Sequence, residues 1–176
     1  MKGFTLIETI VAATIFAMVM SAISSLFIVS VRGQRNILAQ QNLTDNTRAV
    51  LEQMSRQIRM AQKDESGGCT GTARTTYTAS GTSLQFIDYR SNCVTYELFE
   101  AKIRMRPNTS QAFLDLTSDD IRVSRLNFDV RGRAAQDLEQ PRVTIVIEAE
   151  AAGAIPETSP GIVLQTTVSP RNIDVP

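Results

Sequence analysis

The sequence lacks several residue types on which common enzymes and metal proteins depend. Its 176 residues include no histidine, no tryptophan and only two cysteines. Histidine is the commonest general base and the commonest metal ligand, so its absence removes the usual routes to acid–base catalysis and transition-metal binding. No nucleophile motif, phosphate-binding glycine loop or metal-ligand spacing is present either. We therefore expect a protein that is not an enzyme and that needs no cofactor.

An excess of charge of either sign is also missing. The chain carries 18 basic and 18 acidic residues, for a formal net charge of zero. A balanced chain offers no bulk electrostatic attraction for nucleic acid. The length is enough for one globular domain with its own core, together with an appendage.

Charge is scarcest near the N-terminus, where an apolar run extends from Phe4 to Val31. This run of about 28 residues contains one charged residue, Glu8, and no glycine or proline. A helix needs about 20 residues to span a bilayer. A secretory signal peptide would have a shorter apolar region followed by a small-residue cleavage site. Here Lys2 and Gly3 precede the run, so cleavage after Gly3 would leave the apolar segment on the mature protein.

The motif Gly3-Phe4-Thr5-Leu6-Ile7-Glu8 resembles the prepilin motif of type IV pilins and of the pseudopilins of type II secretion. The resemblance implies that a prepilin peptidase cleaves after Gly3 and methylates the new N-terminal Phe4, and that Glu8 supports assembly. It further implies a single-pass protein of the cytoplasmic (inner) membrane with an extracytoplasmic β domain. Such a protein later enters a filament of other pilins or pseudopilins, built at an inner-membrane assembly platform.

The chemistry of Glu8 supports a role in assembly. A carboxylate at membrane depth costs about 2.5–3.5 kcal/mol, so it is usually paired. Cleavage would create an α-amino group on Phe4 that is cationic below a pKa of about 8. Glu8 of one helix could meet the Phe4 amine of a neighbour and fix the register between the helices. Alternatively, Glu8 only favours a helix N-terminus through the macrodipole, an effect of about 0.3–1 kcal/mol.

A helical pattern continues beyond the apolar run. The spacing predicts one helix from about Phe4 to Lys63, loosened near Ser21–Ser25 or Gly33 and stopped by Gly67-Gly68. Glu52 lies four residues before Arg56, which is the favourable order for a helical ion pair. The expected buried stripe consists of Leu43, Thr47, Val50, Leu51, Met54, Ile58 and Ala61.

From Cys69 onward the pattern changes to the period of two that is typical of strands. The expected strands are 74–79, 84–89, 93–99, 102–106, 112–116, 121–130, 143–150 and 162–168. A slip in parity at Ser124-Arg125 predicts a bulge. The expected fold is therefore α+β and pilin-like, with one long helix packed on an antiparallel sheet. The expected divisions are a leader (1–3), an apolar helix half (4–31), an amphipathic half (32–66) and a β domain (67–176).

Cys69 and Cys93 fall in the region that a membrane anchor would place outside the cytoplasm. An even number of cysteines there predicts one disulfide. The bond would close a loop of about 24 residues and contribute roughly 3–4 kcal/mol. Two free buried thiols are the alternative, and the spacing excludes a CxxC redox or zinc motif.

Two charged clusters suggest binding functions. Asp115, Asp119 and Asp120 could hold calcium, as in some major pseudopilins, but they lack the spacing of a calcium loop, and we expect a solvated turn. A group of arginines could contact DNA in an uptake pilus, although we expect them to face water on outward strand positions. This group comprises Arg122, Arg125, Arg131 and Arg133.

Three functions follow in order of preference. The first is a structural subunit of a type IV pilus or type II secretion pseudopilus. It is expected to be a minor subunit because 48–61 is similar to the minor pilins and J-type pseudopilins. The second is a DNA-uptake or adhesion pilin whose β domain binds a ligand. The third is a membrane-tethered enzyme, disfavoured because no catalytic constellation is present.

Overall fold

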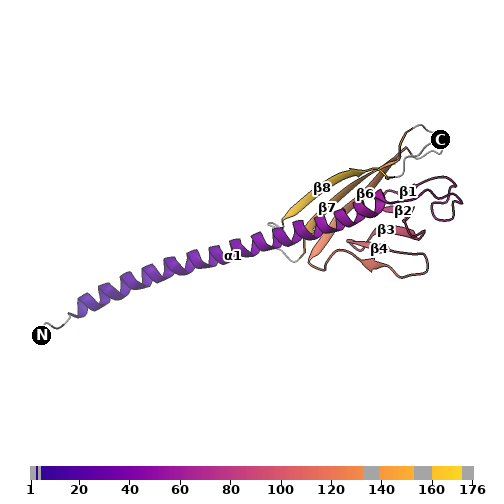
Figure 1. The fold of residues 1–176 in the computed structure, drawn as a ribbon. Helices are drawn as coiled ribbons and strands as arrows, with labels where there is room; N and C mark the ends of the chain where they lie inside the picture. The colour runs from indigo at the N-terminus through magenta and orange to yellow at the C-terminus, as the bar shows by residue number, and fades with distance from the viewer. Residues whose placement is uncertain (1–2, 4, 133–138, 153–159, 172–176) are drawn as a thin grey trace. The chain divides into compact units, whose positions relative to one another are not determined.

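The computed structural model describes residues 3, 5–132, 139–152 and 160–171. Its chain divides into two compact units, Met1–Ala39 and Gln40–Pro176, each with its own contacts. The boundary lies inside the long helix α1, Leu6–Arg59 (Figure 1). The divisions expected at 31 and 66 stay predictions.

The first part of α1 is apolar on all sides. Its large apolar side chains from Leu6 to Val29 are all exposed. The hydroxyls of Thr14 and Ser24 donate to carbonyls one turn back, at 3.0 Å to Ile10 and 2.8 Å to Met20. No loosening occurs at Ser21–Ser25 or at Gly33, where the helix is continuous. This segment is long and apolar enough to cross a membrane, and the Thr14 and Ser24 hydroxyls find hydrogen-bond partners within the helix.

The second part of α1 is amphipathic, and the predicted stripe is confirmed. Its buried residues recur every three or four positions, which places them on one face of the helix. Leu51 is only partly buried and packs at the margin of this face. The predicted ion pair between Glu52 and Arg56 is present on the exposed side, at 2.8 Å. The buried residues of the stripe are Leu43, Thr47, Val50, Met54, Ile58 and, just beyond the helix, Ala61.

The prediction that α1 continues to about Lys63 and stops at Gly67-Gly68 is wrong, because the helix ends at Arg59. Beyond it, the N–H of Gln62 donates to the carbonyl of Ile87 at 2.9 Å, so the chain joins a sheet instead of adding a helical turn. The hydroxyl of Tyr77 donates to the carbonyl of Ile58 at 2.7 Å. The same carbonyl, one of the last four of the helix, also accepts the N–H of Ala61 at 3.1 Å.

The strands form two antiparallel sheets, whereas one sheet was expected. The first sheet has the order β1-β2-β3-β4-β5 and the second has the order β6-β7-β8. In the first sheet the strands are β1 Tyr77–Ser80, β2 Ser83–Ile87, β3 Cys93–Phe99, β4 Lys102–Arg106 and β5 Leu114–Asp115. In the second they are β6 Ile121–Arg131, β7 Arg142–Ala151 and β8 Gly161–Val168. The α+β class, with a long helix packed against antiparallel strands, is confirmed.

The edge of β6 links the two sheets. The N–H of Phe128 donates to the carbonyl of Gly81, and the N–H of Val123 donates to the carbonyl of Ala101, both at 2.8 Å. Gly81 and Ala101 lie in hairpin turns of the first sheet and have positive φ angles of 58° and 61°. The register of β6 against β7 shifts between Val123 and Arg125, which confirms the predicted bulge.

Tyrosine side chains connect the helix to the first sheet. Tyr77 and Tyr96 are among the largest fully buried side chains, and Phe86 lies between their rings at centroid distances of 6.1 and 6.2 Å. The hydroxyl of Tyr96 donates to Oε1 of Gln57 on α1 at 2.8 Å. Each tyrosine thus fills the core with its ring and donates its hydroxyl hydrogen to the helix.

A carboxylate organises the loop between helix and sheet. Asp64 is fully buried, and its Oδ1 accepts from the N–H of Gly67 at 2.8 Å and from Ser66 at 3.2 Å. Its Oδ2 accepts from the N–H groups of Cys69 and Thr70, both at 2.8 Å, and from the Thr70 hydroxyl at 3.1 Å. Burial alone would raise the pKa of Asp64, but these hydrogen bonds outweigh it and hold the pKa well below its usual range.

The predicted disulfide is present in the same loop. Cys69 and Cys93 are bonded with their Cα atoms 5.5 Å apart. The alternative of two free thiols is therefore wrong. Because Asp64 binds the N–H of Cys69, the carboxylate and the disulfide hold the same turn of the loop against β3.

Replacing Asp64 with asparagine should lower the free energy of unfolding at pH 7 by about 2 kcal/mol, because the amide NH₂ would face buried N–H donors. The folded-state pKa is depressed, so the wild-type stabilisation is complete above the ordinary pKa of about 4 and is lost as pH falls below it. Urea unfolding of the full chain in detergent should therefore show a smaller difference in unfolding free energy between wild type and Asp64→Asn at about pH 3 than at neutral pH. Glu65→Gln, at the exposed neighbouring residue, is the control. An equal difference between wild type and Asp64→Asn at both pH values would contradict a stabilising role for the ionised Asp64 carboxylate.

Candidate assembly site at the N-terminus

Glu8 lies in the first turn of α1. The carbonyl of Thr5 accepts the N–H of Glu8 at 3.1 Å and that of Thr9 at 3.3 Å, so Thr5 is the cap residue that precedes the helix. Glu8 is then the third helical residue, and Thr5-x-x-Glu8 has the spacing of a capping box. A helix cap and the predicted pairing with a neighbouring subunit are therefore both compatible with this position.

The surroundings of Glu8 are apolar and exposed. The side chains of Leu6, Ile7 and Ile10 have exposed fractions of 78%, 72% and 55%. In the part of the chain that the structure describes, Glu8 has no ion-pair partner. Phe4, whose amine is the predicted partner, lies outside the described residues. Glu8 is thus a carboxylate on an otherwise apolar helix surface, a position where lipid would make an unpaired charge costly.

The described surroundings of Gly3 leave room for a side chain. Gly3 is exposed, and a Cβ added to it would meet no atom within 4 Å. Nothing in the packing of the described residues around position 3 therefore calls for a glycine.

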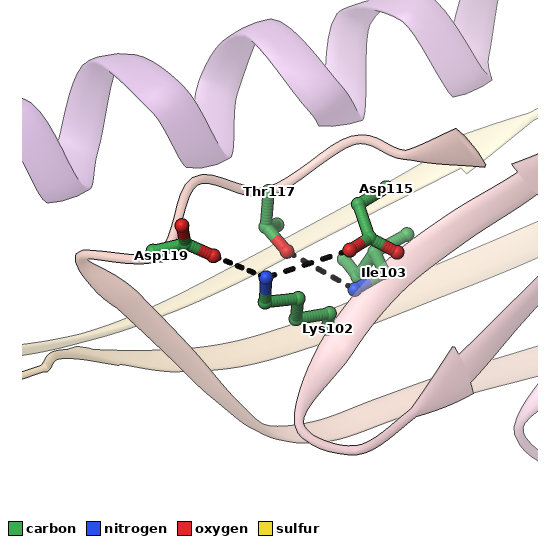
Figure 2. Close-up of polar contacts among 5 residues, drawn as sticks. All are labelled: Lys102, Ile103, Asp115, Thr117 and Asp119. Carbon is green, nitrogen blue, oxygen red and sulfur yellow. Dashed lines mark hydrogen bonds and ion pairs between the residues drawn. The ribbon is translucent and has the colours of Figure 1, made fainter.

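The three aspartates considered for calcium, which we expected to form a solvated turn, do not converge on an empty position. Figure 2 shows the ammonium of Lys102 between Asp115 and Asp119, and the distance from its Nζ to Oδ2 of Asp115 is 3.4 Å. The hydrogen bond to Asp119 raises the pKa of Lys102, and the same bond lowers the pKa of Asp119. Asp120 uses its backbone carbonyl to accept the N–H of Ala152 at 2.7 Å.

A lysine therefore supplies the positive charge at this turn. Beneath the ion pairs, the N–H of Ile103 donates to the Thr117 hydroxyl at 3.2 Å, which holds the same segment against β4 (Figure 2). Among the described residues, no group of three or more acidic, cysteine or histidine side chains could hold a metal ion.

The arginine cluster is neutralised by acidic residues. Arg122 and Arg125 on β6 face Glu150 and Glu148 on β7, at 3.9 and 3.1 Å. Arg131 pairs with Asp129 on its own strand at 3.2 Å. Arg133 lies outside the described residues. Each described arginine of the cluster thus has an acidic partner, so these residues do not form a basic surface.

Comparison with known proteins gives one finding. Residues 1–24 match a family described as "Prokaryotic N-terminal methylation motif". No curated protein and no solved structure matches the chain. The motif is the one found in prepilin leaders, and the match spans the first 24 of the 176 residues. This agrees with the expectation from the sequence, and the match covers the segment that holds Gly3, Phe4 and Glu8.

Replacing Lys102 with methionine should lower the melting temperature slightly, because Asp115 and Asp119 would be left without their shared cation. Chelation with EDTA should leave the wild-type melting temperature unchanged, because an ammonium already balances the two carboxylates. Asp120→Asn is the matched control, since its carboxylate is absent from the ion pairs of Lys102. A wild-type protein destabilised by EDTA would refute the assignment.

Proposed function

We propose that this chain is the precursor of a filament subunit of a type IV pilus or a type II secretion pseudopilus. The observation that carries the proposal is the methylation motif at residues 1–24, which includes the start of a helix whose first half is apolar on all sides. The leader ends at Gly3, cleavage exposes Phe4, and the new amine is methylated. Other pilins or pseudopilins, a prepilin peptidase and an inner-membrane assembly platform are the partners that this role requires.

Before assembly, the subunit is held in the cytoplasmic membrane by the apolar part of α1. Exposed side chains such as Leu26 and Phe27, with exposed fractions of 71% and 68%, favour hydrocarbon over water. The β domain then lies outside the cytoplasm. The disulfide between Cys69 and Cys93 supports this orientation, because disulfides persist in oxidising compartments.

In the filament, Glu8 pairs with the methylated amine of Phe4 on a neighbouring subunit. Two opposite charges that are each costly in an apolar bundle then neutralise each other. Because the pair forms only at one axial offset between helices, it also sets the register of assembly. The cap role of Glu8 within its own helix is compatible with this pairing, because a carboxylate accepts more than one hydrogen bond.

We further propose that the subunit is a minor one. The support is the similarity of 48–61 to the minor pilins and J-type pseudopilins. The DNA-uptake function has no comparable support, because Arg122, Arg125 and Arg131 are paired with acidic side chains.

Processing is tested on full-length protein made with and without a prepilin peptidase. Intact mass and N-terminal sequencing should show loss of residues 1–3 and a methylated Phe4 only when the peptidase is present. Gly3→Leu should stay unprocessed at Met1 while keeping its fold, because Gly3 has no neighbour that a side chain would displace. An intact Met1 in the presence of an active peptidase, or cleavage beyond Val31, would exclude the proposed pathway.

The role of Glu8 is tested with two substitutions that separate its charge from its cap. Glu8→Gln keeps a capping-box residue and removes only the charge, whereas Glu8→Ala removes both. If the charge pairs with a Phe4 amine, both variants should enter the membrane but be recovered in sheared filaments at least about tenfold less than wild type. Glu52→Gln, an exposed carboxylate on the amphipathic part of α1, should assemble normally. Normal assembly of Glu8→Gln would show that Glu8 acts only as a cap.

A further inference from the structure

The outer edge of β8 is an unpaired row of backbone groups. The N–H of Ala151 donates to the carbonyl of Pro160 at 3.1 Å, which fixes the alternation along the ladder of β7 and β8. The backbone groups that bond to β7 therefore belong to Ile162, Leu164, Thr166 and Val168. The backbone N–H and carbonyl groups of the four residues that alternate with them point away from β7. The same alternation holds on β6, at the opposite edge of the sheet, where the backbone N–H of Phe128 points away from β7 and bonds to Gly81.

The outward groups belong to Gly161, Val163, Gln165 and Thr167. No described residue forms a backbone hydrogen bond with them. All four residues are exposed, and the exposed fraction of Val163 is 65%. Among the residues that the structure describes, nothing pairs with the four N–H groups and four carbonyls along this side of β8.

This edge also lacks the usual protection against pairing. Proteins guard edge strands with charges, prolines, short length or a cover. The outer edge of β6 is bonded to the turns at Gly81 and Ala101, and β5 has only two residues. β8, with the sequence GIVLQTTV, is eight residues long and has no charged residue or proline. It is coloured yellow in Figure 1, at the end of the order β6-β7-β8.

We propose that β8 pairs with β8 of a second copy of this chain, antiparallel about a twofold axis through Leu164. In this register Val163 faces Gln165 of the other copy and Gly161 faces Thr167, so all eight free groups on each strand find partners. Sliding the strands by two residues would leave groups at one end without a partner. No charge lies on β8, so two copies meet without like-charge repulsion.

The flanking residues support a second copy as the occupant. Pro160 precedes β8 and Pro170 follows it by two residues, so the edge available for pairing is limited to the self-complementary stretch. Leu164 and Ile162, which are half-buried on the inner side of the sheet, would gain cover from Leu164 and Thr166 of the other copy. The product is one continuous sheet with the order β6-β7-β8-β8-β7-β6. This inference depends only on the edge of β8 and not on the filament role.

Cysteine cross-linking tests the register in the full chain, held in excess detergent micelles so that α1 does not gather two copies. Leu164 would face itself at a Cα distance of about 4.5 Å, which suits a disulfide. Leu164→Cys should therefore give a covalent dimer on mild oxidation. Thr166→Cys is the control, because Thr166 would face Ile162 and lie about 13 Å along the strand from its own counterpart. No dimer with either variant, or equal dimer with both, would overturn the register.

Hydrogen exchange tests the pairing without a cysteine. On concentrating the wild-type chain, the amides of Val163, Gln165 and Thr167 should exchange at least tenfold more slowly. The amides of Ile162 and Leu164, already bonded to β7, should change little. Val163→Pro removes one outward N–H and keeps the ladder to β7, so this variant should show no dependence on concentration. Exchange of the outward amides that is independent of wild-type concentration would refute the proposal, whatever the state of assembly through α1.

Discussion

The burial of one face of α1 against the sheets is the interaction on which the rest of the β domain depends. Met54 and Ile58 are fully buried and contribute to one hydrophobic core with both sheets. Two buried tyrosines then donate their hydroxyl hydrogens to the helix, at the carbonyl of Ile58 and the side chain of Gln57. Antiparallel sheets need a cover for their apolar face, and the amphipathic half of α1 supplies it.

In the proposed filament precursor, the first half of the same helix differs in composition because it meets a different solvent. Where α1 packs on protein, polar residues occupy its outer face, as the ion pair of Glu52 with Arg56 shows. In the first half, the hydroxyls of Thr14 and Ser24 bond to carbonyls of the same helix, and the large side chains are apolar and exposed. Glu8 is the exception, and an exception of this kind favours a specific partner over a general role in folding.

Periodicity predicted most of the fold, because it reports which face of each element is buried. The helical stripe, the strand at 93–99 and the bulge near Arg125 all followed from local spacing. The end of α1 could not be predicted from local spacing, because it depends on the hydrogen bond from Gln62 to Ile87, which lies far away in sequence. The carboxylate of Asp64 was missed for a similar reason, since its donors converge only after the loop has closed. At the N-terminus the motif identified Glu8, but its proposed partner belongs to another subunit and cannot be found in one chain.

The most direct test is whether the two halves of α1 meet different solvents in a bilayer. Nitroxide labels can be placed on cysteines at Val19, in the apolar half, and at the exposed Ala49, in the amphipathic half, because the native cysteines are joined in a disulfide. Power-saturation EPR of the full chain in liposomes should show the label at 19 accessible to oxygen and shielded from a water-soluble nickel complex. The label at 49 should show the opposite. A label at 19 as accessible to nickel as the label at 49 would contradict a membrane-spanning first half and, with it, the proposed filament precursor.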